Sequence, residues 1–194
     1  DKAVEILLIQ GPKCVTKRAT RTASNGLVTS YIEGTQHGVL LELNCETDFV
    51  AKTSDFQQMA ADVSAFVAST KPADVESLLA LELEADKTIQ QLLDEANVSM
   101  GEKIEIRRFA RFEDGFVFVY LHKHDPALPP SVGALVETDV ENEEVAKNVA
   151  QHIAAMSPLY LSKDDVPADV VANERRIAEE TAKAEGKPEQ ALPK

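Results

Sequence analysis

Apolar positions change their spacing along the chain, and each change predicts an element of structure. Residues 2–10 carry an apolar face at helical spacing, and Gly11-Pro12 ends that face because proline cannot continue a helix. From residue 26 the period becomes two, which is typical of a strand. We therefore expect a β-hairpin over residues 26–43, with a loop at 33–38.

The middle of the chain indicates helices followed by more strands. One apolar stripe predicts a long helix over residues 48–69, and a second set of helices is expected within 74–98. Strand periodicity returns over residues 104–112 and again over 116–122, and residues 113–115 between them have the composition of a turn. This pattern predicts a second hairpin.

The last part of the chain combines a strand with two helices. Residues 132–140 form an apolar strand pattern, and residues 143–156 a helical one. The side of this helix expected to be apolar carries Val145, Val149, His152 and Ile153. A further helix over 167–185 is weakly apolar and densely charged, and such a helix usually needs a partner.

This order of elements predicts an α+β fold with two core subdomains, each an antiparallel sheet covered by helices, followed by a protruding, coiled-coil-like helical segment. We expect residues 1–23 to be the end of an N-terminal helical module with a basic linker. Residues 24–114 would form the first core subdomain, and 115–161 an incomplete second one. Residues 162–194 would be the first helix of an incomplete helical hairpin or dimerisation module. Both ends of the chain are expected to be truncated.

Composition narrows the class of protein. The 194 residues are 44% hydrophobic and 27% charged, as in globular domains. A formal net charge of -13 argues against direct nucleic-acid binding, which depends on clustered Lys and Arg. No apolar run is long enough for a membrane span, and the two cysteines, Cys14 and Cys45, fit a reducing cytoplasm. Residues 13–21 are basic, and either a positive patch or a solvated linker explains them.

The segment Asn44–Lys52 is the strongest candidate for a functional site. Thr47 or Asp48 can cap the helix that follows, because a side-chain oxygen can accept bonds from free backbone N–H groups. Capping does not require the aromatic Phe49 beside the acid, and such a side chain could project as an apolar wedge. Phe49 also lies seven residues before Phe56, so the pattern alone favours a buried position in the same stripe. Spacing cannot decide between these interpretations.

The eleven residues from Glu42 to Lys52, ELNCETDFVAK, are similar to the signature segment of the elongation factor Ts family. The resemblance continues in the same order through nearly the whole chain, in residues 101–108, 120–122, 132–136, 149–155 and 165–167. Residues 174–188 look most like the actinobacterial branch of the family.

The resemblance implies a cytoplasmic translation elongation factor that exchanges guanine nucleotide on elongation factor Tu. It implies no covalent chemistry, catalytic residues or cofactor. In the family, a helix tip bearing Thr47, Asp48, Phe49 and Val50 enters the nucleotide domain of elongation factor Tu, and the acid disturbs the magnesium site so that GDP leaves faster. His122 matches a position that faces the third domain of that partner. The sequence does not decide whether the terminal helical module forms a homodimer.

Other interpretations are less well supported. A structural or ribosome-associated relative without exchange activity would not need an intact tip, and a small-molecule enzyme would need a phosphate loop or an activated nucleophile. His122 and His124 could suggest a metal pair, but no third ligand has a convincing spacing. Cys45 is expected to be a small core residue. Glu46, an amide in some relatives, is expected to add negative charge beside the tip.

Overall fold

The first sheet has three strands. The computed structural model describes residues 20–84 and 87–185. In it, β1 (Asn25–Glu33) and β2 (His37–Cys45) form the expected hairpin, and β5 (Glu105–Phe112) pairs with the other edge of β2. Both pairings are antiparallel. The expected helix at 2–10, most of the basic segment at 13–21 and the chain beyond residue 185 lie outside the described residues.

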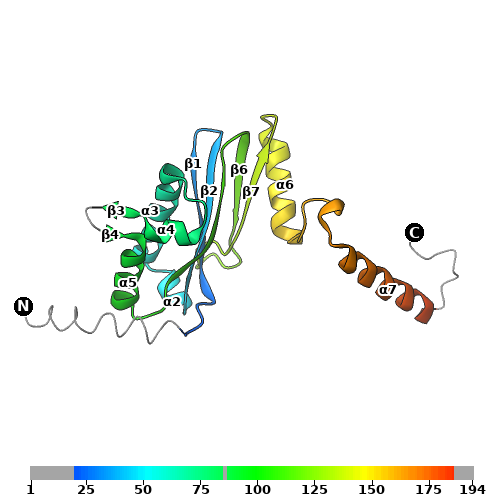
Figure 1. The fold of residues 1–194 in the computed structure, drawn as a ribbon, viewed down its shortest axis with the longest axis horizontal. Coiled ribbons are helices and arrows are strands. Elements are labelled where there is room, and N and C mark those ends of the chain that lie inside the picture. Colours follow the sequence, from blue (N-terminus) through cyan, green and yellow to red (C-terminus); the bar gives the residue numbers. More distant parts are fainter. Residues whose placement is uncertain (1–19, 85–86, 186–194) are drawn as a thin grey trace, which may run out of the picture. The chain divides into compact units, whose positions relative to one another are not determined.

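Helices cover one face of this sheet. α3 (Ser54–Thr70) packs across β1 and β2, α4 (Val75–Ala80) contacts β5, and α5 (Ile89–Met100) follows beside α4 (Figure 1). Side chains from the sheet and the helices form one continuous core, whose largest fully buried members are Phe56, Leu41, Leu43, Leu78, Ile89, Val39, Val63 and Val67.

The helix expected over residues 48–69 is broken, so that prediction is wrong at one point. The chain forms α2 (Asp48–Ala51) and then α3, which begins at Ser54. Between them, Thr53 Oγ1 donates a hydrogen bond to the carbonyl of Val50 (2.8 Å) and accepts one from the N–H of Phe56 (3.3 Å). Threonine therefore caps a new helix instead of continuing the first.

A small strand ribbon lies between α4 and α5 and was not expected from the sequence. It pairs β3 (Glu82–Glu84) with β4 (Lys87–Thr88). The helices expected within 74–98 do form on either side of it. α4 begins with a capping box between Asp74 and Ser77, and α5 begins with another between Thr88 and Gln91.

The second sheet is separate and has two strands. β6 (Phe116–His122) pairs antiparallel with β7 (Val132–Thr138), and α6 (Glu143–Met156) covers them. The expected hairpin of 104–112 with 116–122 is therefore wrong in its pairing, although both strands exist. β5 instead completes the first sheet, where Ile106 lies opposite Leu43 and both side chains are buried. Burial beside a distant strand outweighs the local turn.

The two sheets pack closely, and glycines allow it. A Cβ atom on Gly38 would come within 2.4 Å of Val117 Cγ1, and one on Gly133 within 2.8 Å of Val28 Cγ1. The N–H of Val28 also donates to the carbonyl of Pro130 (2.8 Å), which ties β1 to the loop before β7. The α+β architecture, with helices and small antiparallel sheets, is confirmed: several helices cover the first sheet and α6 covers the second.

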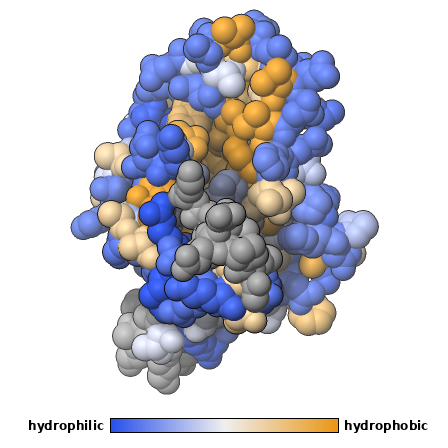
Figure 2. All heavy atoms as spheres, turned by 90° about the vertical axis from the view of Figure 1, so that its right-hand side faces the viewer, coloured by the Kyte–Doolittle hydropathy of each residue, from blue (hydrophilic) through white to orange (hydrophobic). Residues whose placement is uncertain are grey.

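α6 buries only part of the side expected to be apolar: Ile153 packs against the core of the second sheet, but His152 and the two valines are exposed. Ala146 and Ala150 are fully buried, whereas Val145 and Val149 are 50% and 41% exposed. Small side chains let a helix approach a sheet closely, so the alanines face the strands. Figure 2 faces the right-hand side of Figure 1, the side of the core on which α6 lies, and shows hydrophobic side chains gathered on that surface.

Residues 157–185 belong to a second compact unit. In it, the helix expected over 167–185 is confirmed as α7 (Ala168–Ala184). A short 3-10 helix (Lys163–Asp165) precedes it, and Ser162 and Asp165 close that turn with hydrogen bonds of 2.9 Å. Coiled-coil pairing of α7, and the expected domain boundaries, stay predictions. Across the described residues, no helix combines the length and apolar character needed to span a membrane.

Candidate functional site

The segment singled out in the sequence forms a tight turn from β2 into α2. Thr47 has an extended backbone (φ −128°, ψ 158°), and its Oγ1 accepts a hydrogen bond from the N–H of Val50 at 3.5 Å. Thr47, not Asp48, is therefore the N-cap. α2 contains only four residues, too few to be stable alone, so its position depends on contacts with the rest of the fold.

Phe49 projects from this short helix into solvent. Its side chain is 76% exposed, whereas Ala51 is 2% exposed and Val50 packs against the core. The interpretation that Phe49 extends the buried stripe of Phe56 is wrong. That stripe assumed one continuous helix, and the cap at Thr53 starts a new helix with its own phase.

Asp48 lies beside the exposed ring and forms an ion pair with Lys52. Lys52 Nζ is 2.7 Å from Asp48 Oδ2 and 5.5 Å from the centroid of the Phe49 ring. The hydrogen bond from Lys52 is the main reason that the pKa of Asp48 is lowered. The tip therefore presents an ionised acid next to an apolar ring at neutral pH.

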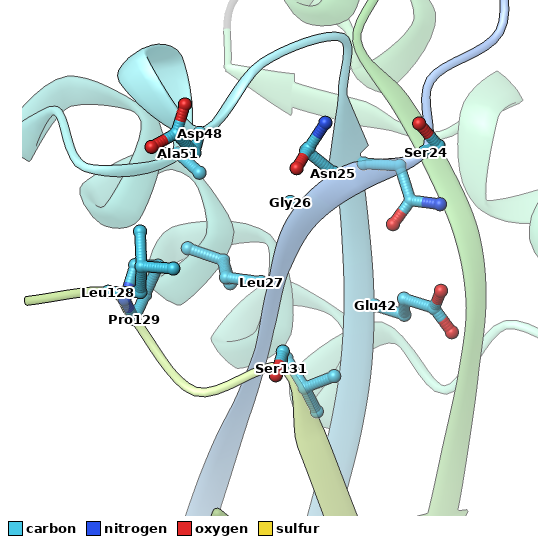
Figure 3. Close-up of a pocket in the computed structure, with 12 residues that line it drawn as sticks. Ser24, Asn25, Gly26, Leu27, Glu42, Asp48, Ala51, Leu128, Pro129 and Ser131 are labelled. Atoms are coloured by element: carbon cyan, nitrogen blue, oxygen red, sulfur yellow. The ribbon is translucent and has the colours of Figure 1, made fainter. Parts of the chain in front are cut away.

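A pocket of about 190 Å³ opens beside α2. Figure 3 shows Asp48 and Ala51 on one side of it, Leu128 and Pro129 on another, and β1 along its wall. The Leu128–Pro129 stretch belongs to the loop that the Val28–Pro130 hydrogen bond holds against β1. The second half of the core thus reaches to the base of the tip.

Glu102 is a site residue that sequence reasoning missed. Its Oε2 accepts hydrogen bonds from the backbone N–H groups of Glu46 (3.0 Å) and Thr47 (2.9 Å), and its Oε1 accepts one from Thr47 Oγ1 (2.5 Å). In return, Glu46 Oε1 accepts a bond from the N–H of Lys103 (2.7 Å) and pairs with Arg21 (3.3 Å). The charge of Glu46 is thus partly compensated within the fold. Glu102 lies within residues 101–108, which resemble the family named above, but nothing in the sequence indicated a chemical role for its side chain.

Cys45 is completely buried at the end of β2, which confirms its expected place in the core. Its Sγ donates a hydrogen bond to the carbonyl of Thr47 (3.1 Å). Burial, followed by the nearby charge of Glu102, raises the pKa of the thiol from 9.0 to about 11. Because the folded-state pKa is raised, the stabilisation that this group contributes is complete below pH 9.0 and is lost as the pH rises towards about 11.

This raised pKa predicts slow thiol chemistry at Cys45. In a Cys14→Ser variant, a disulfide reagent at pH 8 should label Cys45 at least about 100-fold more slowly in the native chain than in urea. Two pKa units reduce the thiolate fraction by about that factor, and burial slows access further. Labelling followed by absorbance measures both rates. Equal rates would contradict the burial of this thiol.

His122 is the last residue of β6 and is half buried. No hydrogen bond among the described residues joins it to the tip. Tyr120 Oη lies 3.1 Å from His122 Nδ1, and the rings of His122 and His124 meet edge to face with centroids 4.9 Å apart. Within residues 20–84 and 87–185, no group of three His, Cys, Asp or Glu side chains is arranged to hold a metal ion.

Comparison with known proteins gives a consistent result. A family model described as elongation factor TS matches residues 46–194. Proteins named elongation factor Ts from Thermobifida fusca and Streptomyces griseus are each 59% identical, over all of this chain and 70% of their own length. The protein of that name from Mycobacterium tuberculosis is 54% identical over all of this chain and 69% of its own. These organisms are actinobacteria, which confirms the branch expected from residues 174–188.

Proposed function

The chain belongs to the elongation factor Ts family of translation elongation factors, and from this premise we propose that it is a guanine-nucleotide exchange factor for elongation factor Tu. It would bind the GDP-bound partner, promote release of GDP and leave when GTP binds, without covalent chemistry. The observation that carries the proposal is the 76% exposure of Phe49 beside an ionised Asp48, on a tip fixed to the core.

Phe49 supplies apolar contact in this mechanism. An exposed aromatic side chain costs free energy in water, and burying it in an apolar slot recovers about 1.5–3 kcal/mol. The tip is already folded, so little conformational entropy is lost when it inserts. Phe49 would therefore act as a wedge in the nucleotide domain of elongation factor Tu.

Asp48 supplies charge at the same place. Magnesium requires near-ideal octahedral geometry and bridges the nucleotide phosphates to the protein, so its site is sensitive to small displacements. A carboxylate delivered next to that site competes with or shifts the existing ligands. GDP would then lose the largest local charge that holds it, while its base stays untouched.

Exchange follows from reciprocal coupling. If the chain binds nucleotide-free elongation factor Tu more tightly than the GDP-bound form, GDP must weaken binding of the chain by the same factor. We assign a second contact, with the third domain of the partner, to His122, whose ring is held by Tyr120 at the end of β6. Two contacts from separate halves of the core would hold the tip in place against the nucleotide domain of its partner.

Release of a fluorescent GDP analogue from elongation factor Tu tests the proposal. The release rate, measured by stopped flow, should rise with the concentration of this chain and then saturate. Chelating magnesium should speed release from elongation factor Tu alone and shrink the additional acceleration by the chain. The exchange function is contradicted if release stays at its spontaneous rate at every concentration of the chain.

Replacing Asp48 with Asn tests the role of the charge. The change keeps the size of the side chain but removes its charge, so the maximal release rate should fall about tenfold, which corresponds to about 1.4 kcal/mol in the barrier. Asp55, an acid in the first turn of α3, provides the matched control, and Asp55→Asn should leave the rate unchanged. A release rate unaffected by Asp48→Asn would remove the acid from the mechanism.

A further inference from the structure

We propose that Glu102 is a positioning residue for GDP release, acting through the base of α2 and not through its own contact with elongation factor Tu. This inference rests on the exchange function proposed above. It also makes a claim about the chain alone, namely that the carboxylate of Glu102 sets the orientation and the mobility of the tip.

α2 has few bonds of its own with which to hold its direction. Its described backbone bonds run from the N–H of Ala51 to the carbonyl of Thr47 (3.3 Å), from that of Lys52 to Asp48 (3.1 Å) and from that of Thr53 to Val50 (3.0 Å). The first N–H groups of any helix have no partner within it, and in a helix of four residues these are most of the total. The orientation of α2 must therefore be set from outside.

Glu102 provides that external support. It accepts three hydrogen bonds from the two residues that precede α2, Glu46 and Thr47. Bonds to an ionised acceptor are about twice as strong as neutral ones. Because two consecutive backbone N–H groups meet the same oxygen, the peptide plane between Glu46 and Thr47 can neither rotate nor shift without breaking a bond. The Glu46 carboxylate returns to the N–H of Lys103, so the two segments are joined in both directions.

The segment that carries Glu102 is itself fixed to the core. Gly101 ends α5 in a left-handed conformation (φ 77°), which a glycine adopts without strain. On the other side, the N–H of Ile104 donates to Asn97 Oδ1 (2.5 Å), and Ile104 is 3% exposed. Glu102 thus lies between the end of α5 and the start of β5. The position of the tip is inherited from these two elements.

Removing this support should affect the rate more than the affinity. Phe49 lies outside the network and would keep its apolar surface, but the tip would sample more orientations. A displacement of about 1 Å in a positioned group can cost about 100-fold in rate. We expect a smaller loss, about tenfold, in the maximal release rate of Glu102→Ala, because α2 keeps its covalent attachment and its buried Ala51.

A conservative variant and a control separate positioning from general stability. In Glu102→Gln, the amide oxygen can accept the two N–H bonds and the amide nitrogen can donate to Thr47 Oγ1, so the maximal rate should stay within about threefold of wild type. Glu105→Ala removes a nearby glutamate that pairs with Lys103 but forms no described bond to α2, and should leave the rate unchanged. A Glu102→Ala chain with the wild-type maximal rate would overturn the proposal.

A combined-variant experiment asks whether Glu102 acts through the tip. If it does, Glu102→Ala should cause no further loss in a chain that already carries both Phe49→Ala and Asp48→Asn, because neither the ring nor the acid is left to position. Losses that multiply would show that Glu102 acts elsewhere, and would overturn the proposal.

Hydrogen exchange of the chain alone tests the claim about mobility independently of exchange activity. In Glu102→Ala, the amides of Ala51 and Lys52 should exchange at least about tenfold faster, while that of Val67 in α3 should keep its rate. Equal acceleration at all three positions would indicate general destabilisation, and no acceleration would indicate that Glu102 does not hold α2. Either result overturns the positioning role. If the wild-type chain fails to release GDP, the exchange function fails, yet the amide result still decides the structural claim.

Discussion

Replacing Phe49 with Ala should lower the maximal rate of GDP release from elongation factor Tu by about 30-fold. The side chain is 76% exposed in the free chain, so its removal takes away apolar surface that only a partner can bury. A loss of about 2 kcal/mol, typical for full burial of a Phe side chain, corresponds to that factor. Stopped-flow release of a fluorescent GDP analogue at saturating concentrations of each chain measures it.

Phe112 provides a comparison for this variant. It is another partly exposed aromatic, at 38%, but it ends β5 on the first sheet and is absent from the tip. Phe112→Ala should therefore release GDP at a rate close to wild type. If Phe49→Ala kept the wild-type rate, the wedge would be wrong while the exchange function itself could still stand.

Replacing Phe56 with Ala should destabilise the chain by about 3–5 kcal/mol. Phe56 is fully buried among the side chains of α3 and the first sheet, and removing its ring leaves a cavity in addition to the lost transfer free energy. Such a change is a large part of the total stability of most domains. Urea denaturation followed by circular dichroism gives the free energy of unfolding, and the midpoint should fall while native helix content persists at low urea.

The same measurement on Phe49→Ala supplies the contrast. Because its ring contacts mainly solvent, this variant should change the free energy of unfolding by less than about 0.5 kcal/mol. The two phenylalanines would then show opposite behaviour, one in stability and the other in nucleotide release. A loss below about 1 kcal/mol for Phe56→Ala would contradict the packing of the core.

These two residues also show where sequence patterns lose their value. Hydrophobic periodicity predicted helical structure over residues 48–69, without its break, and the first hairpin, because those patterns report which side of an element is buried. It could not assign Phe49, since the phase of a helix is defined only within one continuous helix. The cap at Thr53 was the missing information, and a threonine flanked by Lys52 and Ser54 has no unique local signal.

Strand pairing was harder to predict than the strands themselves. Residues 105–112 and 116–122 look like a hairpin because a short turn with glycine separates them. Their partners are set by distant residues, Leu43 for Ile106 and Ala134 for Tyr120. On α6, the helical pattern predicted the bounds and the contact of Ile153 with the core, but the two valines of the same side are exposed. Close packing against the second sheet selected the smaller alanines.

Within the candidate site, the part carried by local chemistry was predictable. Thr47 caps the helix as one of two expected residues, and Cys45 is in the core. Glu102 was not predictable, because a carboxylate that bonds to backbone N–H groups requires no particular residue type at the donor positions. Only the fold brings it to Thr47, and no spacing in the sequence indicates that contact.

The bond between Thr47 and Glu102 joins positions 55 residues apart, and this separation has a consequence for synthesis of the protein. A ribosome adds residues from the N-terminus at about 5–20 per second, so several seconds pass between the two positions. During that interval β2 has no third strand beside it and the tip has no anchor. The conformational entropy lost in closing so long a loop is offset only by the contacts that form when β5 pairs with β2. The nascent chain therefore acquires an anchored tip late, after both ends of this contact have left the ribosome.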